Sequence, residues 1–145
     1  MLEEVQVCER LRRNPPRNIA AYHGCEVKDG SITGIYFTKY TETPMQRVNP
    51  GKLALDGRCG IADSASALTW HRHNDINPSN IMFDGNIPVI IDFDSCGQEG
   101  HSLDTVKRKY EWYDENVKEA MPSTDIGALE EMRMWLLGDT SKLKL

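Results

Sequence analysis

Asp75, Asn80 and Asp92 are the residues of this sequence whose types and spacing are best suited to chemistry. They lie in the stretch HNDINPSNIMFDGNIPVIIDFDSC, where a polar loop leads into two apolar segments joined by the turn sequence DGN. If these segments pair as a hairpin, Asn80 before the first arm becomes a neighbour of Asp92 at the end of the second. Asp75 then lies on the connecting loop. The spacing therefore predicts that three oxygen-bearing side chains converge.

Oxygen ligands of this kind suit Mg²⁺, which keeps several waters and takes one or two carboxylates plus the phosphates of a substrate. We therefore interpret Asn80 and Asp92 as candidate metal ligands. The remaining carboxylate, Asp75, is the candidate catalytic residue, because it is placed to accept a proton from an alcohol nucleophile. Phosphoryl transfer uses a metal ion bound to the phosphates together with a carboxylate of this kind.

The composition sets outer limits on fold and function. A chain of 145 residues is expected to form one domain that buries roughly two-thirds of its unfolded surface. The net charge of −5, with acids and bases interspersed, argues against a nucleic-acid partner. No stretch approaches the roughly 18 apolar residues of a membrane-spanning helix, and the start of the chain is too acidic for a signal peptide. We therefore expect no membrane partner and a cytoplasmic or nuclear location.

No C-x-x-C pair occurs among the four cysteines, which are Cys8, Cys25, Cys59 and Cys96. A zinc site would require distant ligands to converge with them, such as His23, His71 or His101. The simpler interpretation is four reduced thiols, mostly buried as small apolar groups, which fits a reducing compartment.

The first half of the chain contains the elements that must lie above the candidate site. Apolar residues three apart predict a helix over 2–13, which the sequence NPP ends. Residues 18–27 and 31–40 are predicted to be paired antiparallel strands, because the sequence DG between them can supply the positive φ of a tight turn. Residues 41–67 are broken by proline and glycine and indicate at best a weak helix.

The second half contains the hairpin of residues 81–93 and a C-terminal helix. Both arms of the hairpin are apolar enough to be covered on both faces. Residues 95–123 are polar and irregular, which is typical of a functional loop. The helix is predicted over 123–138. Its N-cap is predicted to be Ser123 or Thr124, and its terminal glycine Gly138. Its apolar face is predicted to consist of Ile126, Leu129, Met132 and Leu136.

The pattern H-x-D-x-x-x-x-N, followed by D-F-x, resembles the catalytic loop and metal-binding motif of the protein kinase superfamily. The residues that carry the resemblance are His73, Asp75, Asn80, Asp92 and Phe93, with Pro78 added as in most protein kinases. The resemblance implies an α+β, protein-kinase-like fold that is incomplete. Residues 1–40 would form a remnant of the small lobe with the hinge strand, and residues 41–145 the core of the large lobe. ATP and Mg²⁺ would be the bound groups.

The resemblance extends to residues on either side of the loop. YFTKYTE resembles the strand and hinge that hold adenine, with Thr38 as gatekeeper and the backbone of Lys39 and Thr41 as adenine partners. Met82 resembles the apolar residue under the adenine ring, and Glu4 the glutamate that pairs with the ATP-anchoring lysine. Two internal supports are implied as well. They are a hydrogen bond from the catalytic-loop backbone to Asp125, and an apolar spine of Cys8, Tyr22, His73 and Phe93.

Several positions depart from the pattern of the family. No G-x-G occurs that could form a glycine-rich loop, and the chain begins at the helix that should follow the strand with the ATP lysine. Asn77 replaces the lysine that touches the γ-phosphate, Asn74 the arginine before the catalytic aspartate, and Asp94 the glycine of D-F-G. The lost lysine removes a cation from the transition state, and Lys39 and Arg72 are the first candidates to replace it. The absence of this arginine indicates that phosphorylation of the activation loop does not control the activity.

The function that we predict is ATP- and Mg²⁺-dependent phosphoryl transfer of the protein kinase type, to Ser or Thr hydroxyls of a protein substrate, with impaired activity in this chain. One alternative is a non-catalytic, pseudokinase-like module or degenerate fragment that binds a protein partner. The other is a small-molecule phosphotransferase of the aminoglycoside or choline type, against which Pro78 and Phe93 argue. Because later helices of the large lobe are missing, we expect uncovered apolar faces on the second hairpin and the C-terminal helix, and hence self-association.

Overall fold

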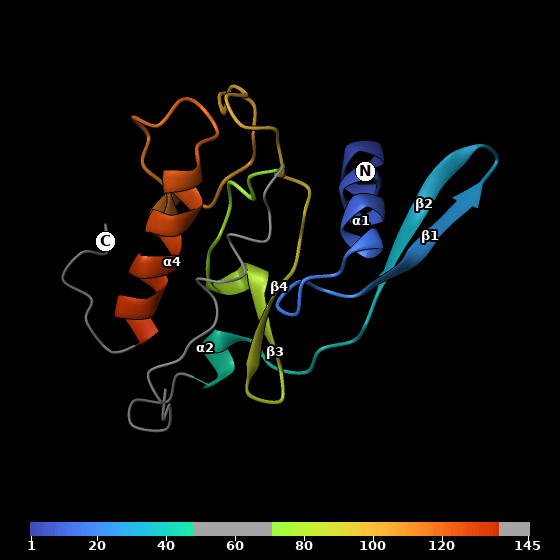
Figure 1. Cartoon of the computed structure of the whole chain (residues 1–145), viewed down its shortest axis with the longest axis horizontal. Helices are drawn as coiled ribbons and strands as arrows, with labels where there is room; N and C mark the ends of the chain where they lie inside the picture. Colours follow the sequence, from blue (N-terminus) through green and yellow to red (C-terminus); the bar gives the residue numbers. More distant parts are fainter. Residues whose placement is uncertain (48–70, 137–145) are drawn as a thin grey trace.

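The structure, a computed structural model, describes residues 1–47 and 71–136. It has the α+β class that the sequence predicts, with two antiparallel hairpins between helices (Figure 1). The elements in chain order are α1 (Leu2–Arg13), β1 (Tyr22–Lys28), β2 (Ser31–Phe37), α2 (Pro44–Arg47), β3 (Ile81–Asp84), β4 (Ile87–Ile90) and α4 (Pro122–Leu136), with 3-10 turns at Pro78–Asn80 and Tyr110–Trp112. In Figure 1, α1 and the first hairpin lie on one side of the β3–β4 hairpin and α4 on the other.

α1 forms where the spacing of apolar residues predicts it. Val5 and Cys8, one turn apart, are buried on one face, and Cys8 belongs to the same apolar core as Phe93. The helix ends at Asn14, whose N–H donates to the carbonyl of Leu11 at 3.2 Å, because the two prolines that follow cannot continue the hydrogen bonding. α1 therefore contributes Cys8 to the core that also contains Phe93, in the segment after β4.

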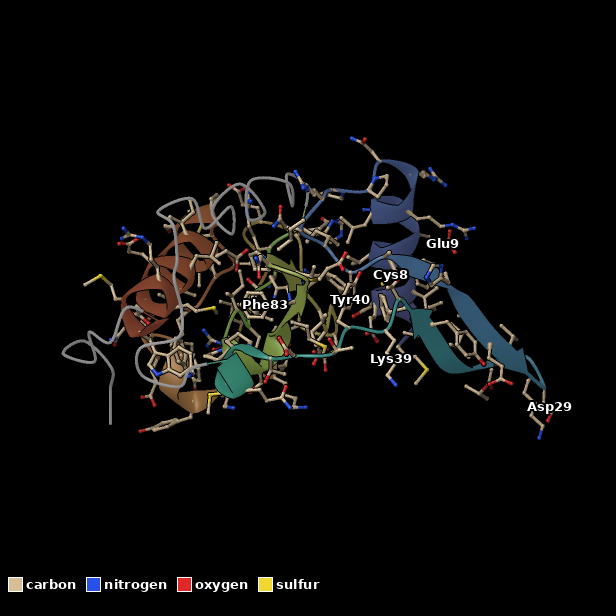
Figure 2. All side chains as sticks on the ribbon, turned by 90° about the horizontal axis from the view of Figure 1, so that it is seen from below. Cys8, Glu9, Asp29, Lys39, Tyr40 and Phe83 are labelled. Atoms are coloured by element: carbon tan, nitrogen blue, oxygen red, sulfur yellow. The ribbon has the colours of Figure 1, made fainter. Side chains whose placement is uncertain are left out.

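The first hairpin confirms the predicted pairing of two strands. β1 and β2 run antiparallel with Tyr22 opposite Phe37. Asp29 and Gly30 form the turn with φ of 51° and 75°, the left-handed conformation that the sequence DG was expected to supply. Asp29 lies at the tip that extends farthest from α1 (Figure 2).

The segment before β1 joins the two hairpins instead of extending the first strand. The N–H of Ile90 donates to the carbonyl of Asn18 at 2.8 Å, and the N–H of Ala20 donates to the carbonyl of Ile90 at 2.9 Å. These two bonds form a parallel bridge between Ile19 and Ile90. The predicted strand over 18–27 is therefore too long at its start, because Ile19 and Ala20 are buried against the end of β4.

The β3–β4 hairpin forms as predicted, with Ile81 opposite Ile90 and Asp84 opposite Ile87. Gly85 has a φ of 59° in the turn, where a side chain would be strained. Four apolar side chains of this hairpin are at most 4% exposed, namely Ile81, Phe83, Val89 and Ile90, and Met82 and Ile87 are half-buried. The expectation that their faces are uncovered is therefore wrong.

α4 begins at Pro122, one residue before the predicted start. Proline suits the first position of a helix, because its fixed φ is helical and the missing N–H would have no partner there. Ser123 and Thr124 therefore lie inside the helix, and neither is its N-cap. The predicted terminal glycine, Gly138, lies outside the described residues.

The predicted apolar face of α4 is only partly correct. Leu129 and Met132 are buried in the core, but Ile126 is 61% exposed. The buried face is rotated toward Trp135, whose ring meets Trp112 edge-on at 5.9 Å between centroids. The side chain of Leu136 is not among those described. Self-association through such exposed apolar side chains stays a prediction.

Residues 95–121 contain one 3-10 turn and otherwise irregular backbone, as the sequence predicts. The segment is tied down by isolated bridges, one between Arg72 and Gly97 and one between Ser102 and Glu119. In the predicted weak region 41–67, the described part ends after α2, and the weak helix lies outside the described residues. Within the described ranges, no helix is both long and apolar enough to span a bilayer.

One buried carboxylate connects α4 to the loop of residues 73–80. The N–H of His73 donates to Oδ2 of Asp125 at 2.8 Å, and the N–H of Asn74 donates to Oδ1 at 2.9 Å. Asp125 is 2% exposed, so these bonds replace water that the two N–H groups cannot reach. The bonds confirm the support that the resemblance implied for this residue.

We expect Asp125→Ala to lower the free energy of unfolding by about 2–4 kcal/mol, because two buried N–H groups lose their acceptor. Urea unfolding followed by circular dichroism measures the change. The matched control is Glu130→Ala on the same helix, because Glu130 forms an exposed pair with Arg133 at 3.1 Å, and such a pair contributes less than about 1 kcal/mol. Equal stability of the two variants would contradict the role of Asp125.

Candidate functional site

The structure brings Asp75 and Asn80 together at the start of β3. The side-chain Nδ2 of Asn80 donates both to the carbonyl of Asp75 at 2.9 Å and to its carboxylate Oδ2 at 3.0 Å. Because the two amide hydrogens are used in this way, the amide oxygen of Asn80 faces away from Asp75. No hydrogen bond within the described part of the chain engages that oxygen, which leaves it suited to a cation.

Asp92 lies next to Asn80 across the second hairpin. The N–H of Ile91 donates to the carbonyl of Asn80 at 2.9 Å, so Asp92 follows directly after the last bond between these two segments. Asp92 has a φ of 63°, an uncommon left-handed conformation for a residue other than glycine. The hairpin therefore places Asp75, Asn80 and Asp92 at one end, as the sequence predicts.

Negative charge accumulates around Asp92. Burial and the charge of Asp94 raise the pKa of Asp92 above its usual range, although the N–H of Asp94 also approaches Oδ1 at 3.5 Å. Burial likewise raises the pKa of Glu4; the terminal amine opposes this shift, and the charges of Asp92 and Asp94 add to it. No ion pair between described residues includes Glu4. This carboxylate excess is one that a divalent cation would neutralise.

The donor set fits a cation that also takes ligands from a bound phosphate. Within residues 1–47 and 71–136, no group of three His, Cys, Asp or Glu side chains is arranged to hold a metal ion. A site here would use Asp92 and the amide oxygen of Asn80, and water and phosphate oxygens would complete it. Mg²⁺ is bound by proteins in this way, with few protein ligands.

Three of the four cysteines, Cys8, Cys25 and Cys96, are free thiols, and Cys59 lies outside the described residues.

The candidate adenine contacts lie on the segment that leaves β2. The N–H of Thr38 donates to the carbonyl of Ala21 at 2.9 Å, and its Oγ1 lies 2.8 Å from Nε2 of His23. Lys39 and Thr41 are exposed, and no hydrogen bond between described residues uses their main chains. Figure 2 shows the Lys39 side chain directed away from the body of the molecule.

Met82 lies close to that segment. The N–H of its neighbour Phe83 donates to the carbonyl of Glu42 at 2.9 Å, which ties the segment to β3. Met82 itself is half-buried. The four predicted adenine-binding residues are thus carried by two connected segments, and their roles stay predictions.

The predicted apolar spine is continuous. The rings of His73 and Phe93 meet edge-on at 5.9 Å between centroids. Cys8, Tyr22 and Phe93 line one cavity of about 160 Å³. Phe37, which sequence reasoning missed, bridges Tyr22 and Phe93 at 5.8 and 6.0 Å between ring centroids. Burial, followed by the charges of nearby glutamates, raises the pKa of Cys8 to about 12, so its thiol is an inert part of this core.

The asparagines that replace charged residues of the family pattern are structural. Asn77 is buried, its Oδ1 accepts the N–H of Ser79 at 2.9 Å and its Nδ2 donates to the carbonyl of Asp75 at 3.0 Å. Asn74 adopts a φ of 64°, and its Nδ2 donates to the carbonyls of Arg72 and Ser95 at 3.1 and 3.0 Å. Both side chains form hydrogen bonds to nearby backbone groups, and Asn74 also binds the segment after Asp92.

Lys109, which sequence reasoning missed, contacts Asp75 through its backbone and Ser79 of the same loop through its ammonium group. Its N–H donates to Oδ1 of Asp75 at 2.7 Å, and its Nζ lies 2.8 Å from Oγ of Ser79. Of the two basic residues that the sequence suggested, Arg72 forms an ion pair with Glu99 at 2.7 Å. Lys39 lies on the segment after β2, as described above. Lys109 had no local signal, because it is separated from Asp75 by a long irregular segment.

The raised pKa of Asp92 predicts that its charge destabilises the folded chain at neutral pH. When the pKa of a carboxyl group is higher in the folded chain than in the unfolded chain, its contribution to stability is fully present below the unfolded-state pKa. That contribution is lost as the pH rises through the folded-state pKa. Asp92→Asn should therefore raise the melting temperature at pH 7, by an amount that shrinks below about pH 4. We expect no such pH-dependent gain for Asp84→Asn, an exposed aspartate at the end of β3. If Asp92→Asn melted at or below the wild-type temperature at pH 7, the conclusion that the charge of Asp92 destabilises the folded chain would be contradicted.

Comparison with known proteins supports the fold alone. No family model matches the sequence, and no curated protein matches it. A chain in the crystal structure of the yeast RNA Pol II CTD kinase CTDK-1 complex matches with a TM-score of 0.75 at 13% sequence identity. The match covers 97% of this chain and 51% of that one, so this chain spans about half the length of the solved chain that it resembles. The α+β arrangement is thus compatible with a partial protein-kinase-like fold.

Proposed function

We propose that this chain carries a Mg²⁺–ATP site of the protein kinase type and that the chain alone transfers phosphate slowly. In this proposal Asn80 and Asp92 hold Mg²⁺ on the phosphates, and Asp75 orients the hydroxyl of a protein Ser or Thr. Adenine lies between residues 38–41 and Met82. The metal, when bound, neutralises charge that develops on the phosphates during transfer.

One observation carries this proposal. Asn80 donates both amide hydrogens to Asp75, and its backbone is bonded to Ile91, directly before Asp92. The carboxylate that would orient a hydroxyl and the oxygens that would bind a cation are therefore fixed relative to each other before any ligand arrives. Preorganisation of this kind is what phosphoryl transfer requires, because it depends on position and charge and little on covalent chemistry.

A non-catalytic module that binds a nucleotide or a protein partner is the second candidate. The observation that favours it is the surroundings of Glu4: burial raises its pKa, the terminal amine lowers it, Asp92 and Asp94 raise it in addition to burial, and no ion pair between described residues includes it. A kinase-type site needs cations on the phosphates to offset their charge. Under this candidate the loop geometry is retained for binding, and Asp75 has no role in transfer.

We expect weak Mg²⁺–ATP binding by wild type and a loss of at least about tenfold in Asp92→Ala, because one carboxylate–metal contact is removed. Isothermal titration calorimetry measures both, and Mn²⁺ serves as a second metal. Asp84→Ala removes an exposed carboxylate at the other end of the same hairpin and should bind as wild type does. Equal affinities for wild type and Asp92→Ala would remove the metal site from the proposal.

The isolated chain is expected to transfer phosphate to a general protein substrate at a rate near background. In-line alignment of the γ-phosphate contributes about 7–11 kcal/mol to such reactions, and this sequence contains no G-x-G for a phosphate-binding loop. Asp75→Asn should therefore change the rate by less than about threefold. The assay is radiolabelled transfer by protein freed of contaminating kinases. A fast rate that Asp75→Asn reduces a hundredfold would show that this chain aligns the phosphate unaided.

A further inference from the structure

Lys109 is connected to the candidate site by two contacts at once. Its backbone N–H donates to Oδ1 of Asp75 at 2.7 Å, and its ammonium lies 2.8 Å from the hydroxyl of Ser79, four residues farther along the same loop. The first contact fixes the main chain of residue 109 against the loop. The second holds the ammonium group over the same loop.

The ammonium group of Lys109 is available to an anion. Its partner Ser79 is a neutral hydroxyl, which binds an ammonium less strongly than a phosphate oxygen does. Lys109 is exposed, and no ion pair that joins described residues includes it. Its flexible four-carbon stem allows the charge to shift by a few ångströms while the backbone contact to Asp75 remains.

The loop itself offers no such charge. Asn77 is buried, and both ends of its amide are used in backbone hydrogen bonds. Arg72 is engaged by Glu99. Meanwhile Asp92, Asp94 and Glu4 make the site strongly negative, which would repel a phosphate that arrives without a cation.

We propose that Lys109 is a phosphate-binding residue: its ammonium leaves Ser79 and binds the terminal phosphate of the nucleotide beside Asp75. This inference rests on the proposed Mg²⁺–ATP site and adds the residue that supplies positive charge there. The charge comes from the segment between Asp92 and α4, and not from the loop that carries Asp75. Lys109 binds only the end of the triphosphate, so it does not align the remaining phosphates for fast transfer.

The test compares Mg²⁺–ATP, Mg²⁺–ADP and adenosine by isothermal titration calorimetry in wild type and Lys109→Met. We expect Lys109→Met to weaken Mg²⁺–ATP binding by roughly tenfold, the effect of one charge-assisted hydrogen bond, with less than about threefold change for ADP and none for adenosine. Lys109→Arg keeps the charge and should bind Mg²⁺–ATP within about threefold of wild type. The matched control is Lys107→Met, which removes the same charge from an exposed lysine of the same segment.

The outcomes separate this inference from the proposed function. If wild type binds neither Mg²⁺–ATP nor adenosine, the proposed site itself is wrong and the inference falls with it. If wild type binds Mg²⁺–ATP and Lys109→Met binds it equally well, the inference alone is overturned. A purely structural role for the contact with Ser79 would make Ser79→Ala and Lys109→Met weaken ATP and adenosine by the same factor, which also overturns it. Thermal melts of each variant establish that it is folded.

Discussion

The geometry of the candidate site depends on the carboxylate of Asp125 more than on any other group. Residues 73–75 run between elements without a strand or helix partner, and a buried backbone N–H without an acceptor is costly. Asp125 accepts two of these N–H groups in succession, from His73 and Asn74. Because it stands in the first turn of α4, the position of the loop is coupled to the packing of that helix. The ring of His73 then meets Phe93, which carries the constraint on to the residue after Asp92.

The second constraint is electrostatic. Asn80, Asp75 and Asp92 are held together by hydrogen bonds and strand pairing. In addition to the effect of burial, however, the charge of Asp94 raises the pKa of Asp92, and the charges of both aspartates raise the pKa of Glu4. Like charges at short distance oppose folding, so this arrangement lowers the stability of the folded chain unless a cation is bound among the carboxylates. A positive group near the loop comes from a distant part of the sequence, where the ammonium group of Lys109 lies 2.8 Å from the hydroxyl of Ser79. The candidate site is therefore assembled from two segments that are far apart in the chain.

The sequence predicted most of the elements and the core of the site, because those depend on local pattern. The D-G turn, the apolar periods of 2–13 and 81–90, and the positions of Asp75, Asn80 and Asp92 all follow from spacing within short stretches. The sequence failed where a long-range contact decides the outcome. Ile19 and Ala20 look like part of β1, yet they pair with Ile90. The predicted helix begins at Ser123, although α4 starts at Pro122, because the lack of an N–H is harmless in a first turn.

The residues least visible in the sequence are those that compensate for its departures from the kinase pattern. Asn74 and Asn77 look like simple losses of charge when they are compared with an arginine and a lysine. In the structure each donates to or accepts from nearby backbone groups, and Asn74 also binds the segment after Asp92 through the carbonyl of Ser95. The loop thereby keeps its shape without long charged side chains. The irregular segment that follows Asp92 brings the backbone of Lys109 to Asp75 and its ammonium group to Ser79. The amides of the asparagines thus hold the loop in shape, and the positive charge near it comes from a separate segment.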